Sequence, residues 1–250
     1  MCEKELTETW NFMASEAVNP LKSSPGTPAQ HLQTEGVETA QNRGAQRALK
    51  RFLDLGLSAA ASIAALPVCL LIAVVIKLDS AGPVIFAADR VGLNGRRFKL
   101  YKFRSMVVDA DAKLRELAHL NQGGARMVKI PNDPRVTRAG KFLRKYSLDE
   151  IPQLWNVLRG DMSLVGPRPQ APGEVELYDD HQRRRLSVPA GITGWWQVTA
   201  RSDPRFEVWV AKDLEYIDHW SLGLDIRILI KTVFVVLAGK DASPSPAGRG

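Results

Sequence analysis

An apolar segment of 22 residues most strongly constrains how this chain can fold. Residues 55–76 contain no charged side chain. A straight helix of that length rises about 33 Å, which is enough to cross a bilayer, and the cores of soluble proteins rarely need so long an apolar run. We therefore expect this segment to be a helix in contact with a membrane.

The residues in and around this segment indicate whether it crosses the membrane. Pro67 lies near its middle, where it removes a backbone hydrogen bond and bends a helix. Both flanks, 43–51 and 90–104, are rich in Lys and Arg. The positive-inside rule places both flanks in the cytoplasm, which favours a re-entrant helix broken at Pro67 over an ordinary single span. The bent backbone then needs local partners, for which Ser58 and Ser62 are candidates.

The rest of the chain divides around this segment. Residues 1–42 are polar and rich in Thr, Glu, Gln, Pro and Ser, so we expect a disordered N-terminal tail there. The predicted re-entrant membrane helix covers 43–80, a cytoplasmic domain covers 81–240, and 241–250 is a second disordered tail. The apolar stretch 224–238 is interrupted by charges, which favours an amphipathic helix lying on the membrane surface.

A β-hairpin is predicted within residues 83–106. Asn94-Gly95 is a strong turn pair between two runs of β-forming residues. On the returning strand, Lys102 and Arg104 point to the same face, where they meet either a phosphate or solvent and lipid headgroups. The expected fold class is α+β, mostly helical with this small hairpin, attached to one leaflet of the membrane.

The stretch 146–158 holds a pair of adjacent carboxylates. Ser147 and Glu150 have the spacing of a capping box, and apolar residues from Ile151 to Leu158 repeat at helical spacing. We expect Asp149 and Glu150 in the first turn of this helix, where the helix dipole and the preceding Arg144 favour ionised carboxylates and bound phosphate. Taken alone, such a pair is more often only a helix cap.

Arg168 stands between two prolines, which stiffen the loop and hold the guanidinium at a set position. That arrangement suits bidentate binding of a phosphate, and the alternative is an ordinary rigid turn with a solvated arginine.

The net charge of +7 indicates an anionic partner. Nucleic acid, anionic lipid and nucleotide substrates all fit that charge. The basic residues gather around the apolar segment and no nucleic-acid-binding motif is present, which favours lipid headgroups and argues against nucleic acid. The two cysteines and four histidines have neither disulfide nor metal-ligand spacing.

Several motifs taken together resemble the bacterial sugar transferase family, the monotopic polyprenyl-phosphate phosphoglycosyl transferases. The resemblance covers residues 45–240, and its C-terminal part is similar to the branch that starts exopolysaccharide chains. It rests on the proline-broken apolar segment and on these sequences: Lys102-Phe103-Arg104-Ser105-Met106, Asn132-Asp133-Pro134-Arg135-Val136-Thr137, Ser147-Leu148-Asp149-Glu150-Ile151-Pro152-Gln153-Leu154, Gly160-Asp161-Met162-Ser163-Leu164-Val165-Gly166-Pro167-Arg168-Pro169, and Gly191-Ile192-Thr193-Gly194-Trp195-Trp196-Gln197-Val198.

The resemblance implies a function and a mechanism. Asp149 matches the nucleophile that attacks the β-phosphate of a UDP-sugar, releases UMP and holds the sugar phosphate before undecaprenyl phosphate accepts it. Glu150 assists as a base or through Mg²⁺, which it holds together with Asp149. Galactose or glucose 1-phosphate is the expected group, and 81–240 becomes the catalytic domain, on the cytoplasmic face of the bacterial inner membrane.

The residues permit this chemistry independently, because phosphoryl transfer needs an ionised nucleophile and cations around the phosphate oxygens. The predicted cations are Lys102, Arg104, Arg135, Arg144 and Arg168. Homo-oligomerisation is left open. The alternative function is an inactive membrane-anchored scaffold of a polysaccharide assembly complex.

Three departures from the family pattern leave the acidic pair untouched and concern the sugar and the membrane break. Leu66 stands before Pro67 where the family often has Ser, and Thr199-Ala200-Arg201 stands where Ser-Gly-Arg is usual. His219 stands where Asn is common before Trp-Ser.

Overall fold

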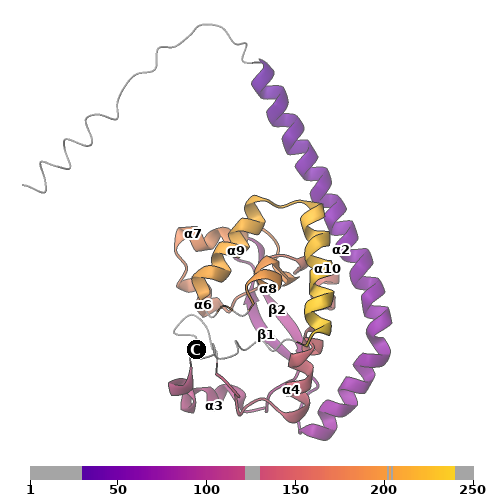
Figure 1. The fold of residues 1–250 in the computed structure, drawn as a ribbon, viewed down its shortest axis with the longest axis vertical. Coiled ribbons are helices and arrows are strands. Elements are labelled where there is room, and N and C mark those ends of the chain that lie inside the picture. Colours follow the sequence, from indigo (N-terminus) through magenta and orange to yellow (C-terminus); the bar gives the residue numbers. More distant parts are fainter. Residues whose placement is uncertain (1–29, 122–129, 202, 204, 240–250) are drawn as a thin grey trace, which may run out of the picture. The chain divides into compact units, whose positions relative to one another are not determined.

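The computed structural model describes residues 30–121, 130–201, 203 and 205–239. The predicted tails therefore lie largely outside the described residues, and the division into tails, membrane helix and catalytic domain stays a prediction. Residues from Gln46 onward form one compact unit. Figure 1 shows the elements of the chain, which run in this order: α2 (Gln30–Asp79), β1 (Ile85–Val91), β2 (Arg97–Phe103), α3 (Ala110–Glu116), α4 (Arg138–Lys145), α5 (Gln153–Arg159), β3 (Ser163–Val165), α6 (Pro172–Glu176), α7 (Asp180–Arg183), β4 (Gly191–Thr193), α8 (Trp195–Thr199), α9 (Phe206–Asp218) and α10 (Leu222–Leu237).

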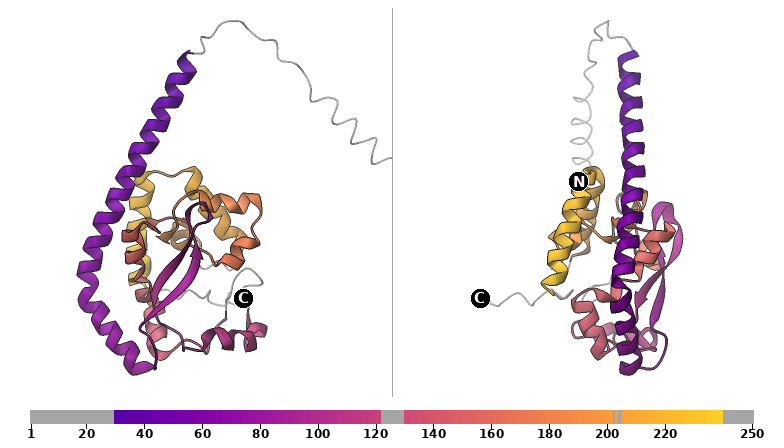
Figure 2. Two further views of the ribbon diagram at one scale, coloured as in Figure 1. Left: turned by 180° about the vertical axis from the view of Figure 1, so that it is seen from behind. Right: turned by 90° about the vertical axis from the view of Figure 1, so that its right-hand side faces the viewer.

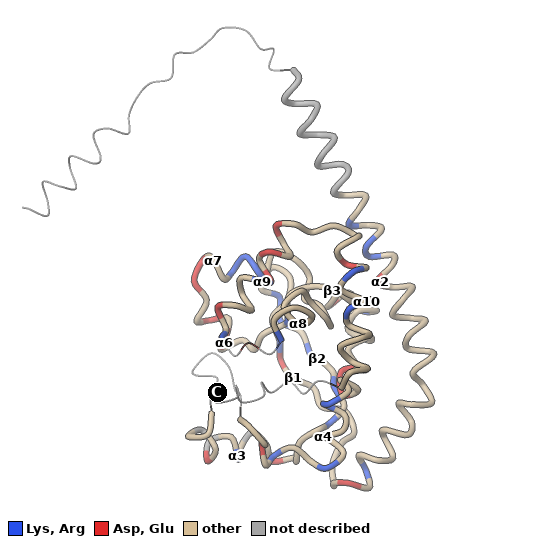
Figure 3. The backbone as a smooth tube through the Cα atoms, viewed as in Figure 1, with Lys and Arg blue, Asp and Glu red and all other residues tan. Residues whose placement is uncertain are grey.

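The apolar segment lies within α2, which continues through Pro67. Among the described residues, only Gly44–Asp79 is long and apolar enough to cross a membrane, and just 11% of its most apolar window is buried. That exposure argues against a core helix. Figure 3 shows the long uncharged stretch between the charges at either end.

The helix curves along this apolar part (Figures 1 and 2). Pro67 has no N–H for the carbonyl of Ile63, and the Ser62 hydroxyl donates to the carbonyl of Ser58 at 2.7 Å. Both a proline and such a serine bond bend helices, so the sequence explains the curvature. The predicted help from Ser62 falls one turn before the proline, and whether the helix is re-entrant stays a prediction.

The hairpin forms as predicted. β1 and β2 pair antiparallel from Ile85 opposite Phe103 to Val91 opposite Arg97. Asn94 and Gly95 both adopt positive φ, at 53° and 78°, which is the conformation that an Asn-Gly turn provides. Mostly helical structure with a small antiparallel sheet confirms the coarse fold class. A second, parallel pair of short strands, β3 and β4, was not predicted.

Apolar clusters join these elements. One cluster packs β2, α5, β3, α9 and α10 around Val157 and Ile228, both fully buried. Another brings Ile72 and Ile76 of α2 against Phe103 of β2 and Leu143 of α4. The C-terminal part of α2 therefore packs on β2 and α4, next to the turn that carries the candidate site.

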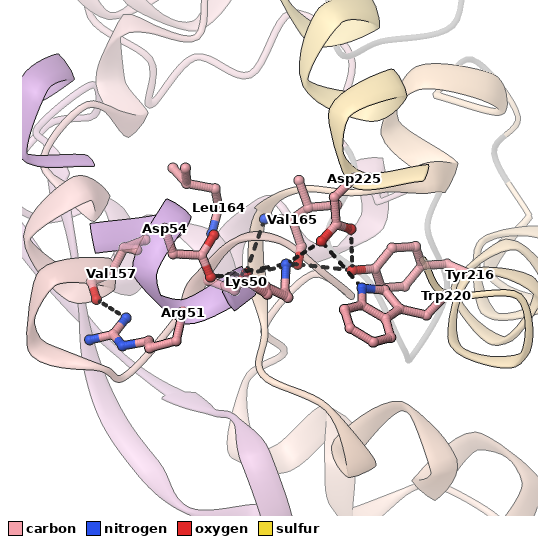
Figure 4. A network of polar contacts seen from close by, with 10 residues as sticks. Lys50, Arg51, Asp54, Val157, Leu164, Val165, Tyr216, Trp220 and Asp225 are labelled. Atoms are coloured by element: carbon pink, nitrogen blue, oxygen red, sulfur yellow. Dashed lines mark hydrogen bonds and ion pairs between the residues drawn. The ribbon is translucent and has the colours of Figure 1, made fainter. Parts of the chain in front are cut away.

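The part of α2 that directly precedes the apolar segment is fixed by a buried network that we call the polar clamp, consisting of Lys50, Asp54, Ser163, Tyr216 and Asp225 (Figure 4). Lys50 Nζ donates to Asp225 Oδ2 at 2.6 Å, and Ser163 Oγ donates to Asp54 Oδ2 at 2.8 Å. The clamp joins residues 50–54 of α2 to β3 and to α10, so α10 begins beside the middle of α2 (Figure 1).

The C-terminal half contains a helix with exposed apolar side chains and a buried ion pair. The stretch 224–238 is helical, in α10, and Ile230, Phe234 and Leu237 are among its exposed side chains. That exposure agrees with the predicted amphipathic character. Arg185, in a run of three arginines, is buried and paired with Asp213 at 2.6 Å.

Candidate active site

The acidic pair lies in a short 3-10 turn, Leu148–Glu150, between α4 and α5. Ser147 follows Tyr146, the C-cap of α4, and adopts φ 54°, and its N–H donates to the carbonyl of Arg144 at 3.2 Å. A residue in this left-handed conformation terminates the preceding helix. Its side chain makes no capping bond, so the predicted capping box is wrong.

α5 itself begins only at Gln153, after Pro152. Because Pro152 has no N–H, the backbone bonds of this turn span three residues, such as Ile151 N to the carbonyl of Leu148 at 3.3 Å. Asp149 and Glu150 therefore precede the first turn of α5 instead of lying in it. Gly160 ends α5 with φ 88°, a left-handed conformation that glycine adopts readily.

The apolar residues that flank the pair hold the turn in place. Leu148 and Ile151 pack against the cluster that contains Ile76, Phe103 and Leu143. Asp149 is 7% exposed. The turn is thus fixed on the C-terminal part of the apolar segment of α2 and on the end of β2, with one carboxylate buried.

The buried face of α5 differs from the one that the helical spacing of the apolar residues in 151–158 indicates. Trp155 belongs to that apolar pattern but is 57% exposed, whereas its neighbour Asn156 is fully buried. The helix is rotated because Asn156 forms hydrogen bonds with β2, which no apolar pattern reveals.

Two cations reach Glu150. Lys102 Nζ donates to Glu150 Oε1 at 2.8 Å, and Arg168 Nη1 lies 3.8 Å from the same oxygen. Lys102 comes from β2 and Arg168 from the loop after β3, so three distant segments of sequence meet here. The side chains of Lys102 and Glu150 are each 19% exposed, which leaves the pair accessible from solvent.

Arg144 is the third predicted cation that the structure brings to the pair. Its Nε donates to Ser105 Oγ at 2.8 Å, and its charge acts on Asp149. Ser105, which sequence reasoning did not assign to the site, therefore holds a site cation in position.

The pKa values of the two carboxyls are shifted in opposite directions. Burial raises the pKa of Asp149 above its ordinary value, and the charge of Glu150 adds to the rise, while Lys102 and Arg144 oppose it. Burial also acts to raise the pKa of Glu150, but Lys102 and Arg168 outweigh it and hold that pKa below the usual range. Divergent pKa values in adjacent groups are typical of sites that carry out chemistry.

The remaining predicted cations, Arg104 and Arg135, contact residues other than the acidic pair. Arg104 is buried and its Nη2 donates to the carbonyl and hydroxyl of Ser80, at 2.6 and 3.0 Å. β2 ends at Phe103, so Lys102 and Arg104 diverge instead of sharing a face. Arg135 pairs with Asp133 at 2.7 Å, although its charge is felt at Arg144. The phosphate-binding roles of both stay predictions.

Arg201 is a site residue that sequence reasoning did not assign. Its positive charge lowers the pKa of Glu150. The signal was its place after Thr199-Ala200, where it corresponds to the arginine of the family pattern.

The residues of the pair also fit a divalent cation. Mg²⁺ is commonly held by one or two carboxylates together with water and substrate phosphates. Asp149 and Glu150 supply adjacent oxygens and repel each other electrostatically, which a cation would relieve. Among the described residues no group of three acidic, histidine or cysteine side chains gathers in this way, so water and substrate would complete the coordination.

Comparison with known proteins places the site in a family context. Residues 45–239 match the model of the family described as "Bacterial sugar transferase". This match covers the apolar segment of α2 and every element from β1 to α10.

Three relatives illustrate the similarity. The galactosyl transferase CpsE of Streptococcus agalactiae is 47% identical over 198 residues, covering 77% of this chain and 43% of the relative. The undecaprenyl-phosphate galactose phosphotransferase of Salmonella typhimurium is 44% identical, over 79% of this chain and 43% of the relative. The exopolysaccharide production protein ExoY of Rhizobium meliloti is 41% identical, over 74% of this chain and 83% of the relative. The chain thus spans less than half the length of the first two.

Proposed function

This chain belongs to the bacterial sugar transferase family, and we propose that it transfers a hexose 1-phosphate from a UDP-sugar to undecaprenyl phosphate. The observation that carries the proposal is the buried Asp149 beside Glu150, with Lys102 at 2.8 Å and Arg168 at 3.8 Å from the Glu150 carboxylate. Two acids among at least four cations form a site with surplus positive charge, which suits a diphosphate.

The proposed first step is an attack by the Asp149 carboxylate on the β-phosphorus of the UDP-sugar. A new bond forms between an Asp149 oxygen and that phosphorus, and the bond to the oxygen bridging the two phosphates breaks. UMP leaves with the electron pair, and the sugar phosphate remains on Asp149 as an acyl phosphate. Burial of Asp149 supports this role, because a poorly solvated carboxylate is a better nucleophile than a hydrated one.

In the proposed second step a phosphate oxygen of undecaprenyl phosphate attacks the same phosphorus. The bond to Asp149 breaks, which regenerates its carboxylate and releases undecaprenyl-diphospho-sugar. Lys102, Arg144 and Arg168 stabilise the charge that develops on the phosphate oxygens in both steps. Glu150 accepts a proton from the attacking phosphate or helps to hold Mg²⁺ with Asp149, and this ion would supply further charge neutralisation at the phosphates.

The sugar we propose is galactose or glucose, and the product would start an exopolysaccharide chain. Galactose is supported by the names of two relatives, and exopolysaccharide by that of ExoY. We propose that α2 is re-entrant, with the catalytic domain on the cytoplasmic face of the bacterial inner membrane. The exposed apolar part of α2 and its bend support that topology.

The test of the reaction is UMP release from a panel of UDP-sugars, with undecaprenyl phosphate and Mg²⁺, by the full chain in nanodiscs. We expect release by the wild type and none by Asp149→Asn, and restoration by Mg²⁺ after chelation. If the folded wild type releases UMP from no UDP-sugar, the scaffold function gains support. Full activity of Asp149→Asn would show that Asp149 is not the nucleophile.

The topology has a separate test. Single cysteines are placed at Gln46 and Ala81, both exposed and on opposite ends of the apolar segment, in a background with Cys2 and Cys69 replaced by Ser. A membrane-impermeant thiol reagent should reach both from the same side. Labelling from opposite sides would indicate an ordinary single span.

A further inference from the structure

Asn156 is a fully buried polar residue on α5, and its side chain contacts the backbone of β2. Its Nδ2 donates to the carbonyl of Lys99 at 2.7 Å, and its Oδ1 accepts from the N–H of Tyr101 at 3.1 Å. Lys99 and Tyr101 are alternate residues of one strand, so both groups point to the same edge. The Asn156 amide thus takes the place that a peptide group of a neighbouring strand would occupy.

This contact completes the edge of β2 that faces away from β1. β1 pairs with β2 along its whole length on one side. On the other side the Asn156 amide satisfies two partly buried backbone groups, the carbonyl of Lys99 and the N–H of Tyr101, which would cost free energy if left unpaired. The main-chain carbonyl of Asn156 also accepts from Asp161 and Met162, at 3.0 and 3.3 Å. Asn156 is therefore fixed both to the strand and to the chain that follows α5.

The two elements joined by Asn156 are those that position the Lys102–Glu150 pair. Lys102 follows Tyr101 directly on β2, and Glu150 ends the turn that leads into α5. Side chains alternate between the faces of a strand, so a slip of one residue would turn Lys102 away from Glu150. The position of β2 relative to α5 thus decides whether this ion pair forms.

We propose that Asn156 is a positioning residue of the site, whose amide sets the register between β2 and α5 and so holds Lys102 against Glu150. The catalytic consequence rests on the proposed function, because Lys102 acts on the charge of both carboxyls. Its structural consequence, the protection of the Lys102 amine by Glu150, does not depend on any activity.

The first measurement concerns that structural consequence. Wild type, Asn156→Ala and the milder Asn156→Ser are treated in nanodiscs with an amine-acylating reagent, and modification is quantified by mass spectrometry. The ratio of Lys102 to the exposed Lys141 of α4 serves as the internal reference. We expect this ratio to rise about tenfold in Asn156→Ala, which corresponds to losing about 1.4 kcal/mol of a charge-assisted hydrogen bond. Arg159→Gln, an exposed change on the same helix, should leave the ratio unchanged.

The second measurement is the pH dependence of UMP release. Both Asn156 substitutions are uncharged, so they alter the electrostatics of the site only by displacing other groups. We expect a fall of about tenfold to a hundredfold, as for a small misplacement of catalytic groups. The acidic limb should move to higher pH, as it should in Lys102→Met, and combining the two substitutions should give no further shift.

Specific outcomes would overturn the proposal. If the Asn156 variants melt at a lower temperature while the folded protein keeps the wild-type labelling ratio and acidic limb, Asn156 is only a stabilising residue. If Asn156→Ala does not fold, Asn156→Ser decides by the same criteria. If the wild type releases no UMP, the proposed function fails, but the labelling ratio still decides the role of Asn156.

Discussion

Lys50 and Lys102 each contact a carboxylate in a cluster with two acidic residues, and the surroundings of the two clusters differ. In the polar clamp, Lys50 bonds Asp225 and lies 4.0 Å from Asp54. At the candidate site, Lys102 bonds Glu150, next to Asp149. The charged side chains of the clamp, Lys50, Asp54 and Asp225, are 8 to 13% exposed. Those of the Lys102–Glu150 pair are 19% exposed.

The other partners of the carboxylates separate the two clusters more clearly. In the clamp they are uncharged donors, namely Ser163 and the N–H of Leu164 for Asp54, and Tyr216 and Trp220 for Asp225. At the site they are further cations, Arg144, Arg168 and Arg201. Neutral donors complete a closed structural network, whereas surplus cations leave a positive site that an anionic substrate can fill. Similar residue types therefore form a closed network in one region and an open, positively charged site in the other.

The largest effect should come from removing the clamp lysine. Lys50→Met leaves two buried carboxylates without their cation, which typically costs about 3–5 kcal/mol. The free energy of unfolding of residues 46–239 should fall by that amount in detergent. Lys102→Met is the matched change at the more open site and should cost much less. Equal losses would show that both clusters are structural.

Arg168→Gln should give the reverse pattern. The guanidinium lies 3.8 Å from Glu150 and is half-buried, so its loss should change the unfolding free energy little. Removing one group that stabilises transition-state charge typically costs about a hundredfold in rate, and we expect that loss in kcat for UMP release. Arg159→Gln is the control, because Arg159 is exposed and pairs only locally with Asp161 at 3.3 Å. A melting-temperature loss in Arg168→Gln without a loss of kcat would contradict the assignment.

Lys102→Met should also move the pH dependence of the reaction. Burial raises the pKa of Asp149 and Lys102 lowers it, so removal of Lys102 raises that pKa further. The nucleophile must be ionised, and activity is lost as pH falls through its pKa. The acidic limb of kcat should therefore shift to higher pH in the variant. A shift to lower pH, or none in a folded variant, would show that Lys102 does not act on the nucleophile.

The sequence predicted those parts of the fold that depend on local pattern. The apolar run 55–76 and the Asn94-Gly95 turn each need only a few neighbouring residues, and both are present. The capping box failed because the end of α4 had already committed Ser147 to a left-handed conformation, which depends on the preceding helix.

At the site, too, the sequence does not predict features that depend on contacts between distant segments. The motifs identified Asp149, Glu150, Lys102, Arg144 and Arg168, which the structure brings together. Arg104 is also a cation and lies two residues after Lys102, so the sequence alone does not distinguish the two. Its side chain lies against Ser80, because β2 ends before it at Phe103. Asn156 and the clamp depend on contacts between elements more than 50 residues apart in sequence, as with Asn156 and Lys99 at a separation of 57. No periodic pattern within one segment reports such contacts.

The smallest effect tests the neutral side of the comparison. Burial raises the pKa of Tyr216, so its hydroxyl stays protonated and donates to Asp225 at 2.7 Å. Tyr216→Phe removes this donor, but Asp225 keeps Lys50 and Trp220. We expect a loss of about 1.5 kcal/mol in unfolding free energy and an unchanged pH profile of UMP release. A changed acidic limb would mean that the clamp and the site are electrostatically coupled, which would end their separation into a structural and a functional cluster.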